Sequence, residues 1–466
     1  MVCRYHYMLR ARFARLAIFR PAPLRKRLWQ GGIALAILVL SIAAMNQLVS
    51  RDKSLTPQML GNDFLPFYMA GQFVRDGRIA SLYDLPAVKD AQLQIAAKAE
   101  LEPKFGPFWN PPFYAWMFVS LSKMPYREAL MYWVLLNVAA MMCAVLMLRR
   151  MFPANADWRT TTLVPLLLLV SMPFIQAISH GQNTFISLLL VAMTATAWRE
   201  RRALSAGIAC GLLLYKPQLA AVLAIVMPLD LGWRAALSMG FTAACLLLIT
   251  GFTLPGSIGD YIDKLPLNLH FMQVESAYLW ERHVTFKGFW RLLLQGSAAG
   301  EASFAVVALT TGCAALVGLG LVRAVIRTKR RAVDNPFTGE TSQRRRDRLI
   351  AATIAATPLL MPFYFDYDLL LLAVPATLLA VEITGRPVGQ TLDRAERWLV
   401  GAWAILFLWM MINPGVSGLT RVNGTVILLT TVTSLLVHRA SRRQQSIVET
   451  VLDHDTLGVT AHRMAA

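Results

Sequence analysis

Long apolar runs alternate with short polar segments along almost the whole chain. A helix needs about 20 mostly apolar residues to cross the hydrocarbon core of a bilayer, and residues 31–49 have this length and character. Apolar runs occur at residues 31–49, 111–122, 128–148, 161–178, 183–198, 203–229, 235–254, 301–327, 349–364, 368–384, 398–412 and 418–438. The pattern predicts an all-α, polytopic transmembrane helix bundle with about 10–12 transmembrane helices.

Two of these runs do not fit a simple crossing. The run at 111–122 rises only about 18 Å as a helix, which is short of the hydrocarbon core of about 30 Å. The run at 203–229 is interrupted by Tyr215, Lys216, Pro217 and Gln218. Either every run crosses once, or the first of the two dips and returns while the second is a hairpin of two short helices. The sequence leaves both alternatives open.

The distribution of charge predicts the orientation in the membrane. Of the 466 residues, 56% are hydrophobic and 16% charged, and the formal net charge is +19. Residues 1–30 hold eight Lys or Arg and no acid, and residues 328–348 hold seven against three acids. By the positive-inside rule, both segments are cytoplasmic. Because these basic residues lie in separate loops and not in one basic domain with interleaved aromatics, a nucleic-acid partner is not predicted.

Two large loops are balanced in charge and are predicted to face outward. Residues 51–109 hold seven basic and seven acidic side chains, and residues 255–300 hold four of each. The chain is thus predicted to consist of a basic cytoplasmic N-terminus (1–27), a membrane-embedded domain (28–440) with exported loops at 51–110 and 255–300, and a polar cytoplasmic tail (441–466). The first run is predicted to be an uncleaved signal anchor.

The arginines at 149–150 and 199–202 distinguish the two topologies. If every run crosses once, these clusters lie outside, against the positive-inside rule. If 111–122 returns and 203–229 is a hairpin, the same clusters lie inside. In both versions Lys216 lies within the depth of the membrane.

An acidic residue opens an amphipathic segment in the first exported loop. Asn62 and Asp63 precede Phe64, Phe67 and Tyr68, whose spacing predicts a helix with an acidic N-cap. A capping aspartate satisfies free backbone N–H groups and needs no catalytic role. A carboxylate held near the membrane surface is also suited to act as a general base, so both roles are compatible.

Lys216 lies inside an apolar run, where an ionisable side chain costs about 2.5–3.5 kcal/mol to insert. Such residues face a cavity or a partner. Beside the helix-breaking Pro217, a lysine can hold the phosphate of a lipid-linked substrate. A lysine that is paired for structural reasons is the alternative.

Two further segments carry candidate chemistry. Residues 281–291, with Arg282 and His283, mix cations and aromatic rings as a sugar or phosphate surface does, although an interfacial aromatic belt has the same composition. Asp366 and Asp368 are spaced like a divalent-metal pair, but helix capping explains one of them more simply. Four of the five cysteines lie in apolar runs and none in the exported loops, so no disulfide framework or cysteine-rich metal site is predicted. No cofactor is predicted, and a divalent metal stays an open alternative.

Several short motifs together resemble glycosyltransferase family 87. They are Asp63-Phe64 through Phe67-Tyr68, Ala70-Gly71, Leu82-Tyr83-Asp84, Asn110-Pro111-Pro112, Gly181-Gln182-Asn183, Lys216-Pro217-Gln218 and Tyr367-Asp368. The family includes the mannosyltransferases of phosphatidylinositol mannosides. The resemblance implies a GT-C fold, a polyprenyl-phosphate sugar as donor, and an acidic catalytic base in the first exported loop, which is Asp63 here.

Together with the candidate residues above, this resemblance implies an inverting transfer of a mannose-like hexose from a polyprenyl-phosphate donor to a lipid or glycan acceptor. The reaction is expected on the outer face of a bacterial inner membrane, with Asp63 as base and Lys216, Arg282 and His283 at the donor phosphate. The predicted substrate-binding residues are Tyr68, Asn110, Gln182, Gln218, Asp366 and Asp368. The alternatives are a transporter or lipid flippase that uses Lys216 with Asp366 and Asp368, and a membrane scaffold without turnover.

Overall fold

Helices form most of the described structure. The computed structural model describes residues 24–49, 58–154, 156–334, 339–386 and 391–442. Within these ranges the only β-type pairing is a single bridge between His283 and Phe365. The predicted N-terminal segment 1–27 and tail 441–466 fall almost wholly outside them. The prediction of an all-α, polytopic helix bundle is confirmed.

Seven helical segments of the described chain are long and apolar enough to cross a membrane. They are α2 (Leu24–Val49), α5 (Tyr126–Arg150), α11 (Trp233–Thr253), α14 (Phe304–Asp334), the segment Asp366–Thr384 that includes α16 (Ala373–Thr384), α17 (Arg394–Thr420) and α18 (Gly424–Ser441). An eighth results if α6 (Trp158–Leu169) and α7 (Met172–Ser179), which meet at a bend of 52°, form one span. The described chain thus has fewer full-length spans than the sequence predicted, because several apolar runs form shorter elements.

The apolar run 203–229 forms a hairpin of two short helices. It consists of α9 (Ala203–Leu212) and α10 (Pro217–Leu231), which are separated by a 3₁₀ turn at Leu213–Tyr215. Trp198, at the end of the preceding α8 (Thr184–Arg199), donates from Nε1 to Asp230 near the end of α10 at 2.7 Å. The hairpin therefore begins and ends at the same level of the bundle. Ten residues of α9 rise about 15 Å, half of the hydrocarbon core.

The apolar run 111–122 also forms no crossing helix. It folds into two 3₁₀ turns, Pro112–Phe118 and Leu121–Lys123. The first turn packs against α3 (Leu65–Arg75). At their closest approach, a Cβ atom on Gly71 would lie 2.4 Å from the carbonyl oxygen of Phe118, so no larger residue fits there. The run 203–229 thus follows the hairpin alternative, and the run 111–122 forms no crossing helix.

Cationic segments from distant parts of the chain meet at one end of the bundle. Arg346, in the segment predicted to be cytoplasmic and now in α15 (Gly339–Leu360), donates to the carbonyl of Arg199 at 2.7 Å. Arg199 in turn donates to the carbonyl of Met151 at 2.8 Å. The arginine clusters at 149–150 and 199–202 therefore lie together with Arg346. We call this end the cationic end.

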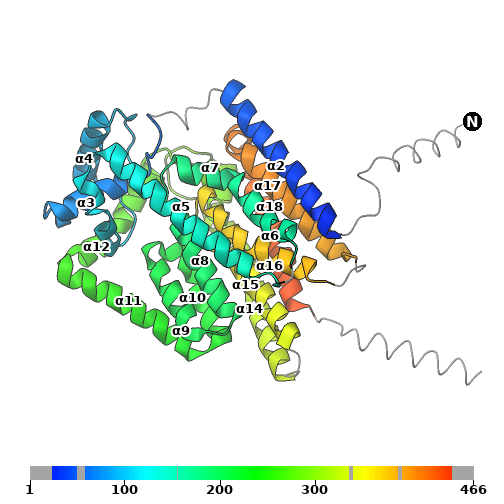
Figure 1. Cartoon of the computed structure of the whole chain (residues 1–466). Helices are drawn as coiled ribbons and strands as arrows, with labels where there is room; N and C mark the ends of the chain where they lie inside the picture. Colours follow the sequence, from blue (N-terminus) through cyan, green and yellow to red (C-terminus); the bar gives the residue numbers. More distant parts are fainter. Residues whose placement is uncertain (1–23, 50–57, 155, 335–338, 387–390, 443–466) are drawn as a thin grey trace, which may run out of the picture.

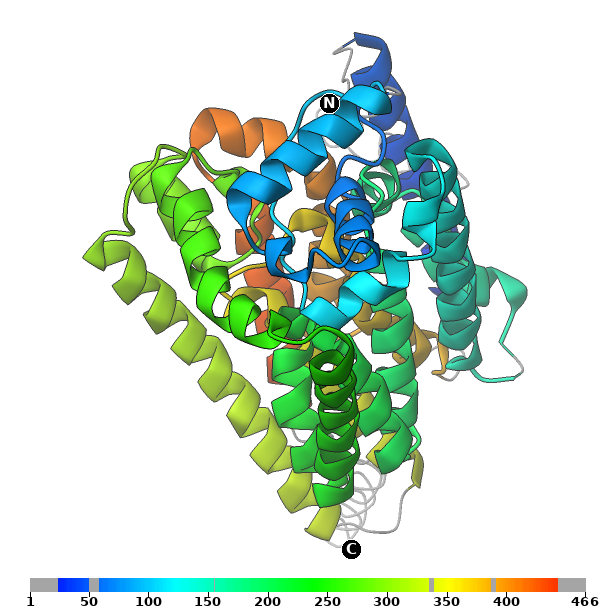
Figure 2. The same ribbon diagram turned by 90° about the vertical axis from the view of Figure 1, so that its left-hand side faces the viewer.

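The two balanced loops meet at the opposite end. They contain α3, α4 (Leu85–Lys98), α12 (Ser257–His270) and α13 (Phe286–Gln295). Figure 1 shows α3, α4 and α12 gathered at one side of the bundle, and in Figure 2 the blue segment with α3 and α4 lies across the upper ends of the green helices. Asn268 of α12 donates to the carbonyl of Tyr83 at 3.0 Å, which joins the two loops into one cover over the bundle.

Candidate active site

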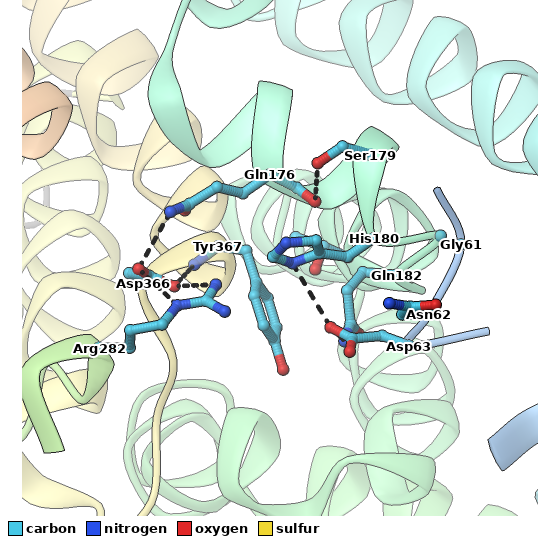
Figure 3. Close-up of polar contacts among 12 residues, drawn as sticks. Gly61, Asn62, Asp63, Gln176, Ser179, His180, Gln182, Arg282, Asp366 and Tyr367 are labelled. Carbon is cyan, nitrogen blue, oxygen red and sulfur yellow. Dashed lines mark hydrogen bonds and ion pairs between the residues drawn. The ribbon is translucent and has the colours of Figure 1, made fainter. Parts of the chain in front are cut away.

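Two turns from distant parts of the chain hold Asp63. The amide of Gly61 donates to the carbonyl of Ser179 at 2.8 Å, and the amide of Asp63 donates to the carbonyl of His180 at 3.0 Å. The Asp63 carboxylate accepts a hydrogen bond from Nε2 of Gln182 at 2.7 Å and lies 3.5 Å from Nδ1 of His180 (Figure 3). Its side chain is 39% exposed. The carboxylate is thus fixed in direction and open to an incoming hydroxyl group.

Gly181 makes this close approach of the two turns possible. Its φ of +69° lies in the left-handed region that favours glycine. A Cβ atom on Gly181 would lie 3.0 Å from Cβ of Phe64 and 3.2 Å from Cα of Gly61. Trp133 donates from Nε1 to the Gly181 carbonyl at 2.8 Å and fixes the turn from the other side. A larger residue at 181 is therefore expected to separate Asp63 from Gln182.

Asp63 does not cap α3, so the capping prediction is wrong. The helix begins at Leu65 with Phe64 as its N-cap residue, and no side chain accepts a hydrogen bond from its first turn. A proline, Pro66, occupies this turn and has no N–H to satisfy. The carboxylate of Asp63 points to Gln182 and His180 instead. Asp63 therefore lacks the helix-capping role that the sequence predicted.

His180 lies beside Asp63 as a neutral imidazole. Burial lowers the pKa of His180 below its ordinary value, although the Asp63 carboxylate acts in the opposite direction. The buried Nδ1 atom has no hydrogen-bond partner in the described chain. The ring therefore adds no positive charge that would stabilise the ionised carboxylate of Asp63.

A second acidic residue, Asp366, is held by an arginine from the second charge-balanced loop, residues 255–300. Nε and Nη2 of Arg282 lie 3.2 and 2.9 Å from its two carboxylate oxygens. Gln176 donates to the same carboxylate at 3.1 Å, and the amide of Tyr367 donates to it at 2.9 Å. Burial acts to lower the pKa of Arg282, but the charge of Asp366 outweighs this and raises it, so the guanidinium stays charged. Within the described residues, no hydrogen bond uses its Nη1 group.

A third acidic residue, Asp368, pairs with Lys216 at the tip of the α9–α10 hairpin. The ammonium of Lys216 lies 3.0 and 3.2 Å from the two carboxylate oxygens. Thr184 donates to the same carboxylate at 2.9 Å. The side chains of Lys216 and Asp368 are only 9% and 3% exposed. Lys216 therefore has the paired environment that the sequence offered as an alternative, and its contact with a donor phosphate stays a prediction.

Tyr367 stands between the two ion pairs. Nζ of Lys216 lies 5.3 Å from the centroid of its ring, and Cζ of Arg282 lies 5.8 Å from the same centroid. In Figure 3 the ring extends into the space between Arg282 and Asp63. The hydroxyl group makes no hydrogen bond within the described residues. The Tyr367 hydroxyl thus offers a free donor and acceptor in the space between Arg282 and Asp63.

Removing Lys216 alone is expected to destabilise the protein strongly. The variant Lys216→Met leaves the buried carboxylate of Asp368 unpaired, which costs about 3–5 kcal/mol. The double variant Lys216→Gln/Asp368→Asn keeps a hydrogen-bonded amide pair without buried charge, so it is expected to melt close to the wild type. Thermal unfolding in detergent measures both. Equal losses in the single and double variants would contradict this interpretation of the pair.

His283 lies in an aromatic enclosure and is not exposed to solvent. Its side chain is fully buried, with ring centroids of Phe365 and Phe363 at 4.3 and 4.9 Å. Burial, together with the neighbouring cations Arg282 and Lys287, lowers the pKa of His283 to about 3. A neutral, enclosed imidazole is poorly suited to bind a phosphate. Its predicted phosphate contact has no support in this geometry, and its carbonyl instead accepts a hydrogen bond from Asn423 at 2.9 Å.

The remaining predicted residues have different surroundings. Tyr68 is buried and donates to the carbonyl of Met124 at 2.6 Å, so it supports the loop that carries Asp63. Asn110 is buried and donates to the carbonyl of Tyr215 at 2.7 Å, which ties the first loop to the hairpin tip next to Lys216. Gln218 is half-buried at the start of α10. Substrate contacts of these three residues stay predictions.

The Asp-x-Asp motif does not form a joint site. Asp366 is bound by Arg282 and Asp368 by Lys216, so each carboxylate has its own cation. In the described chain, no group of three or more His, Cys, Asp or Glu side chains is arranged to hold a metal ion. Sequence reasoning missed Gln176 and Tyr367. Tyr367 was part of the Tyr367-Asp368 motif, which could have drawn attention to it.

Comparison with known proteins assigns a class to this arrangement. Residues 108–338 match the model of Glycosyltransferase family 87. The helix bundle and this match together define a membrane glycosyltransferase. The match supports the resemblance to family 87 that the sequence motifs had predicted. The matched range includes Gln182, Lys216 and Arg282, while Asp63 and Asp366 lie outside it. No curated protein and no solved structure matches the chain.

Proposed function

We propose that the protein transfers a hexose from a polyprenyl-phosphate sugar to a lipid or glycan acceptor, with inversion at the anomeric carbon. Asp63 accepts the proton of the acceptor hydroxyl, and the oxygen forms a bond to the anomeric carbon. The bond from that carbon to the phosphate oxygen breaks, and polyprenyl phosphate leaves. The observation that carries the proposal is an oriented, open carboxylate that faces a charged guanidinium across Tyr367.

Arg282 is the cation that we assign to the departing phosphate. Two of its nitrogens are bound to Asp366, which fixes the plane of the guanidinium and leaves Nη1 for the ligand. A prearranged donor stabilises the charge that develops on a leaving phosphate. Lys216 is already bound to both oxygens of Asp368, so we assign it the neutralisation of that carboxylate and the support of Tyr367.

An apolar cavity supports a lipid-linked donor. It measures about 470 Å³ and lies among α2, α6, α16 and α17. A smaller cavity lined by Gln176 and Asp366 shares the wall residues Pro173, Leu369 and Met410 with it. The apolar space thus leads toward the Arg282–Asp366 pair. An isoprenoid chain in this cavity would bring its phosphate to Arg282, as the reaction requires.

The distribution of cations supports an outward-facing site. By the positive-inside rule, the cationic end lies in the cytoplasm, and Asp63 is then at the outer face. Arg25 near the start of α2 donates to the carbonyl of Thr384 at 3.1 Å, and Arg439 near the end of α18 donates to Glu382 at 2.9 Å. Glu382 also binds Arg348 of α15, which is two residues from Arg346 of the cationic end. Both ends of the described chain thus lie near the cationic end, and we expect them on the cytoplasmic side of a bacterial inner membrane.

A transporter or flippase has less support. That alternative relied on Lys216, Asp366 and Asp368 as mobile charges along a path. Each carboxylate is instead neutralised by a dedicated cation, and the family match is to glycosyltransferases.

The proposal is tested with purified protein in proteoliposomes. Polyprenyl-phosphate mannose and polyprenyl-phosphate glucose are offered with a lipid acceptor, and nucleotide-activated forms of the same sugars serve as controls. We expect one polyprenyl phosphate to be released per sugar transferred, and the product to have the opposite anomeric configuration by NMR. Transfer from the nucleotide sugars, or retention of configuration, would contradict the proposal.

A further inference from the structure

A second large cavity lies between α14 and α18. It measures about 500 Å³ and is lined by Phe286 of α13, by residues 313–327 of α14, by residues 430–441 of α18 and by Arg442, which follows α18. We call it the α14–α18 groove. α14 runs along the edge of the molecule (Figure 2), and only 11% of its most apolar window is buried. The two helices touch at Gly320, where a Cβ atom would lie 3.1 Å from Cγ1 of Val437.

The groove is cationic at one end. Arg323 and Arg327 lie one turn apart on α14, and Arg442 directly follows the end of α18. Arg327 donates from Nη1 to the carbonyl of Ser441 at 3.0 Å, so these arginines are at the same level. No Asp or Glu is among the described residues that line the groove. This end therefore attracts an anion.

The cationic part of the groove lies far from Asp63. Arg439 of α18, between His438 and Arg442 in the sequence, donates to Glu382 at 2.9 Å, and Glu382 also binds Arg348 of α15. Arg348 is two residues from Arg346, which defines the cationic end. The charged mouth of the groove is thus at the opposite end of the bundle from the candidate active site.

The rest of the groove is apolar. Its wall includes Leu316 and Val317 on α14, Val437 on α18 and Phe286 on α13. From Arg327 back to Cys313, α14 rises about 21 Å, a length comparable to an extended acyl chain. Because α14 is mostly exposed, the groove is open along its side to the surrounding membrane. One charged end followed by a long apolar stretch has the shape and chemistry of an anionic phospholipid.

We propose that the α14–α18 groove binds an anionic phospholipid of the cytoplasmic leaflet. Its phosphate contacts Arg323 and Arg327, because arginine is suited to pair with phosphate oxygens. One acyl chain lies along Leu316, Val317 and Val437. This lipid is neither donor nor acceptor, since its phosphate lies at the charged mouth of the groove, at the end of the bundle opposite Asp63.

A second copy of the chain fits the groove less well. In a two-fold symmetric dimer the same surfaces face each other, so Arg323 and Arg327 would approach the same arginines of the partner. Like charges in such an interface repel each other. An anionic lipid instead neutralises these side chains and fills the apolar space.

The full-length protein in detergent tests the proposal by native mass spectrometry. Phosphatidylglycerol and phosphatidylcholine with identical acyl chains are titrated, and glycerol 3-phosphate serves as the head group without chains. We expect phosphatidylglycerol to bind at least about tenfold more tightly than phosphatidylcholine, since two charged contacts to the phosphate region discriminate net charge. Binding of glycerol 3-phosphate as tight as that of phosphatidylglycerol would overturn the lipid proposal, as would equal binding of the two lipids.

Variants assign the binding to the groove. Arg323→Gln/Arg327→Gln is expected to remove the preference for phosphatidylglycerol, and Arg323→Gln alone, at an exposed position, is expected to weaken it without affecting folding. The control Arg149→Gln/Arg150→Gln makes the same change of charge on exposed residues of the cationic end outside the groove. Val317→Phe fills the apolar part and is expected to weaken binding of both lipids. Equal loss in the control variant, or formation of dimers in place of lipid adducts, would overturn the proposal.

Discussion

Asp63→Asn is expected to lower the rate of sugar transfer by about 10²–10⁴-fold, the usual contribution of a general base. The amide cannot accept the proton of the acceptor hydroxyl, so the attack of this hydroxyl on the anomeric carbon loses its general base. The shape of the side chain and a hydrogen bond to Gln182 are preserved, and the position is partly exposed. The measurement is kcat in proteoliposomes with a polyprenyl-phosphate sugar, together with the melting temperature.

The matched control for this variant is Asp90→Asn. Asp90 is an exposed carboxylate on α4 in the same charge-balanced loop, residues 51–109, so the change in charge and side-chain volume is identical. We expect its activity to equal that of the wild type. Full activity of Asp63→Asn, or an equal loss in Asp90→Asn, would remove Asp63 from the reaction.

Arg282→Gln/Asp366→Asn is expected to lower kcat by about 10²–10³-fold, the effect of removing one prearranged donor from a site where charge develops. Both partners are changed because Arg282→Gln alone leaves the buried carboxylate of Asp366 unpaired and destabilises the fold. In the double variant the two amides remain hydrogen-bonded, so the melting temperature is expected to stay near that of the wild type. The lower kcat then reflects weaker stabilisation of the departing phosphate and not a loss of folded protein.

The second ion pair of the site provides the control. Lys216→Gln/Asp368→Asn removes a buried pair of the same kind beside the same tyrosine ring. If Arg282 carries the phosphate and Lys216 neutralises Asp368, this variant is expected to keep at least about one third of the wild-type kcat, since replacing a buried pair as a unit is often nearly neutral. A loss of about 10²-fold or more, without destabilisation, would assign the phosphate to Lys216 as well.

The fold class could be predicted from the sequence because each membrane-crossing helix is recognised from its own apolar residues. Each run of about 20 apolar residues is readable without knowledge of its neighbours. The hairpin at 203–229 was different, since the sequence allowed a broken crossing as well. The hydrogen bond between Trp198 and Asp230 decides between them, and no pattern along the chain contains that contact.

The contacts of the acidic residues in the site could not be predicted, because they join distant parts of the chain. Asp366 and Asp368 are two residues apart and suggest a joint metal site, but they lie in a 3₁₀ turn. With three residues per turn, side chains two apart point in different directions, and so each carboxylate meets a different cation. The capping of α3 by Asp63 failed for a similar reason, because the contact with residues 179–182 redirects the carboxylate.

The ion pair of Lys216 with Asp368 has a consequence for biosynthesis. The two residues are 152 positions apart, so a ribosome adding about 5–20 residues per second makes the lysine roughly 8–30 s before its counter-charge. During that interval an ammonium among lipid tails is unfavourable. The α9–α10 hairpin is therefore expected to reach its final depth only after the segment that begins at Asp366 has left the translocation machinery.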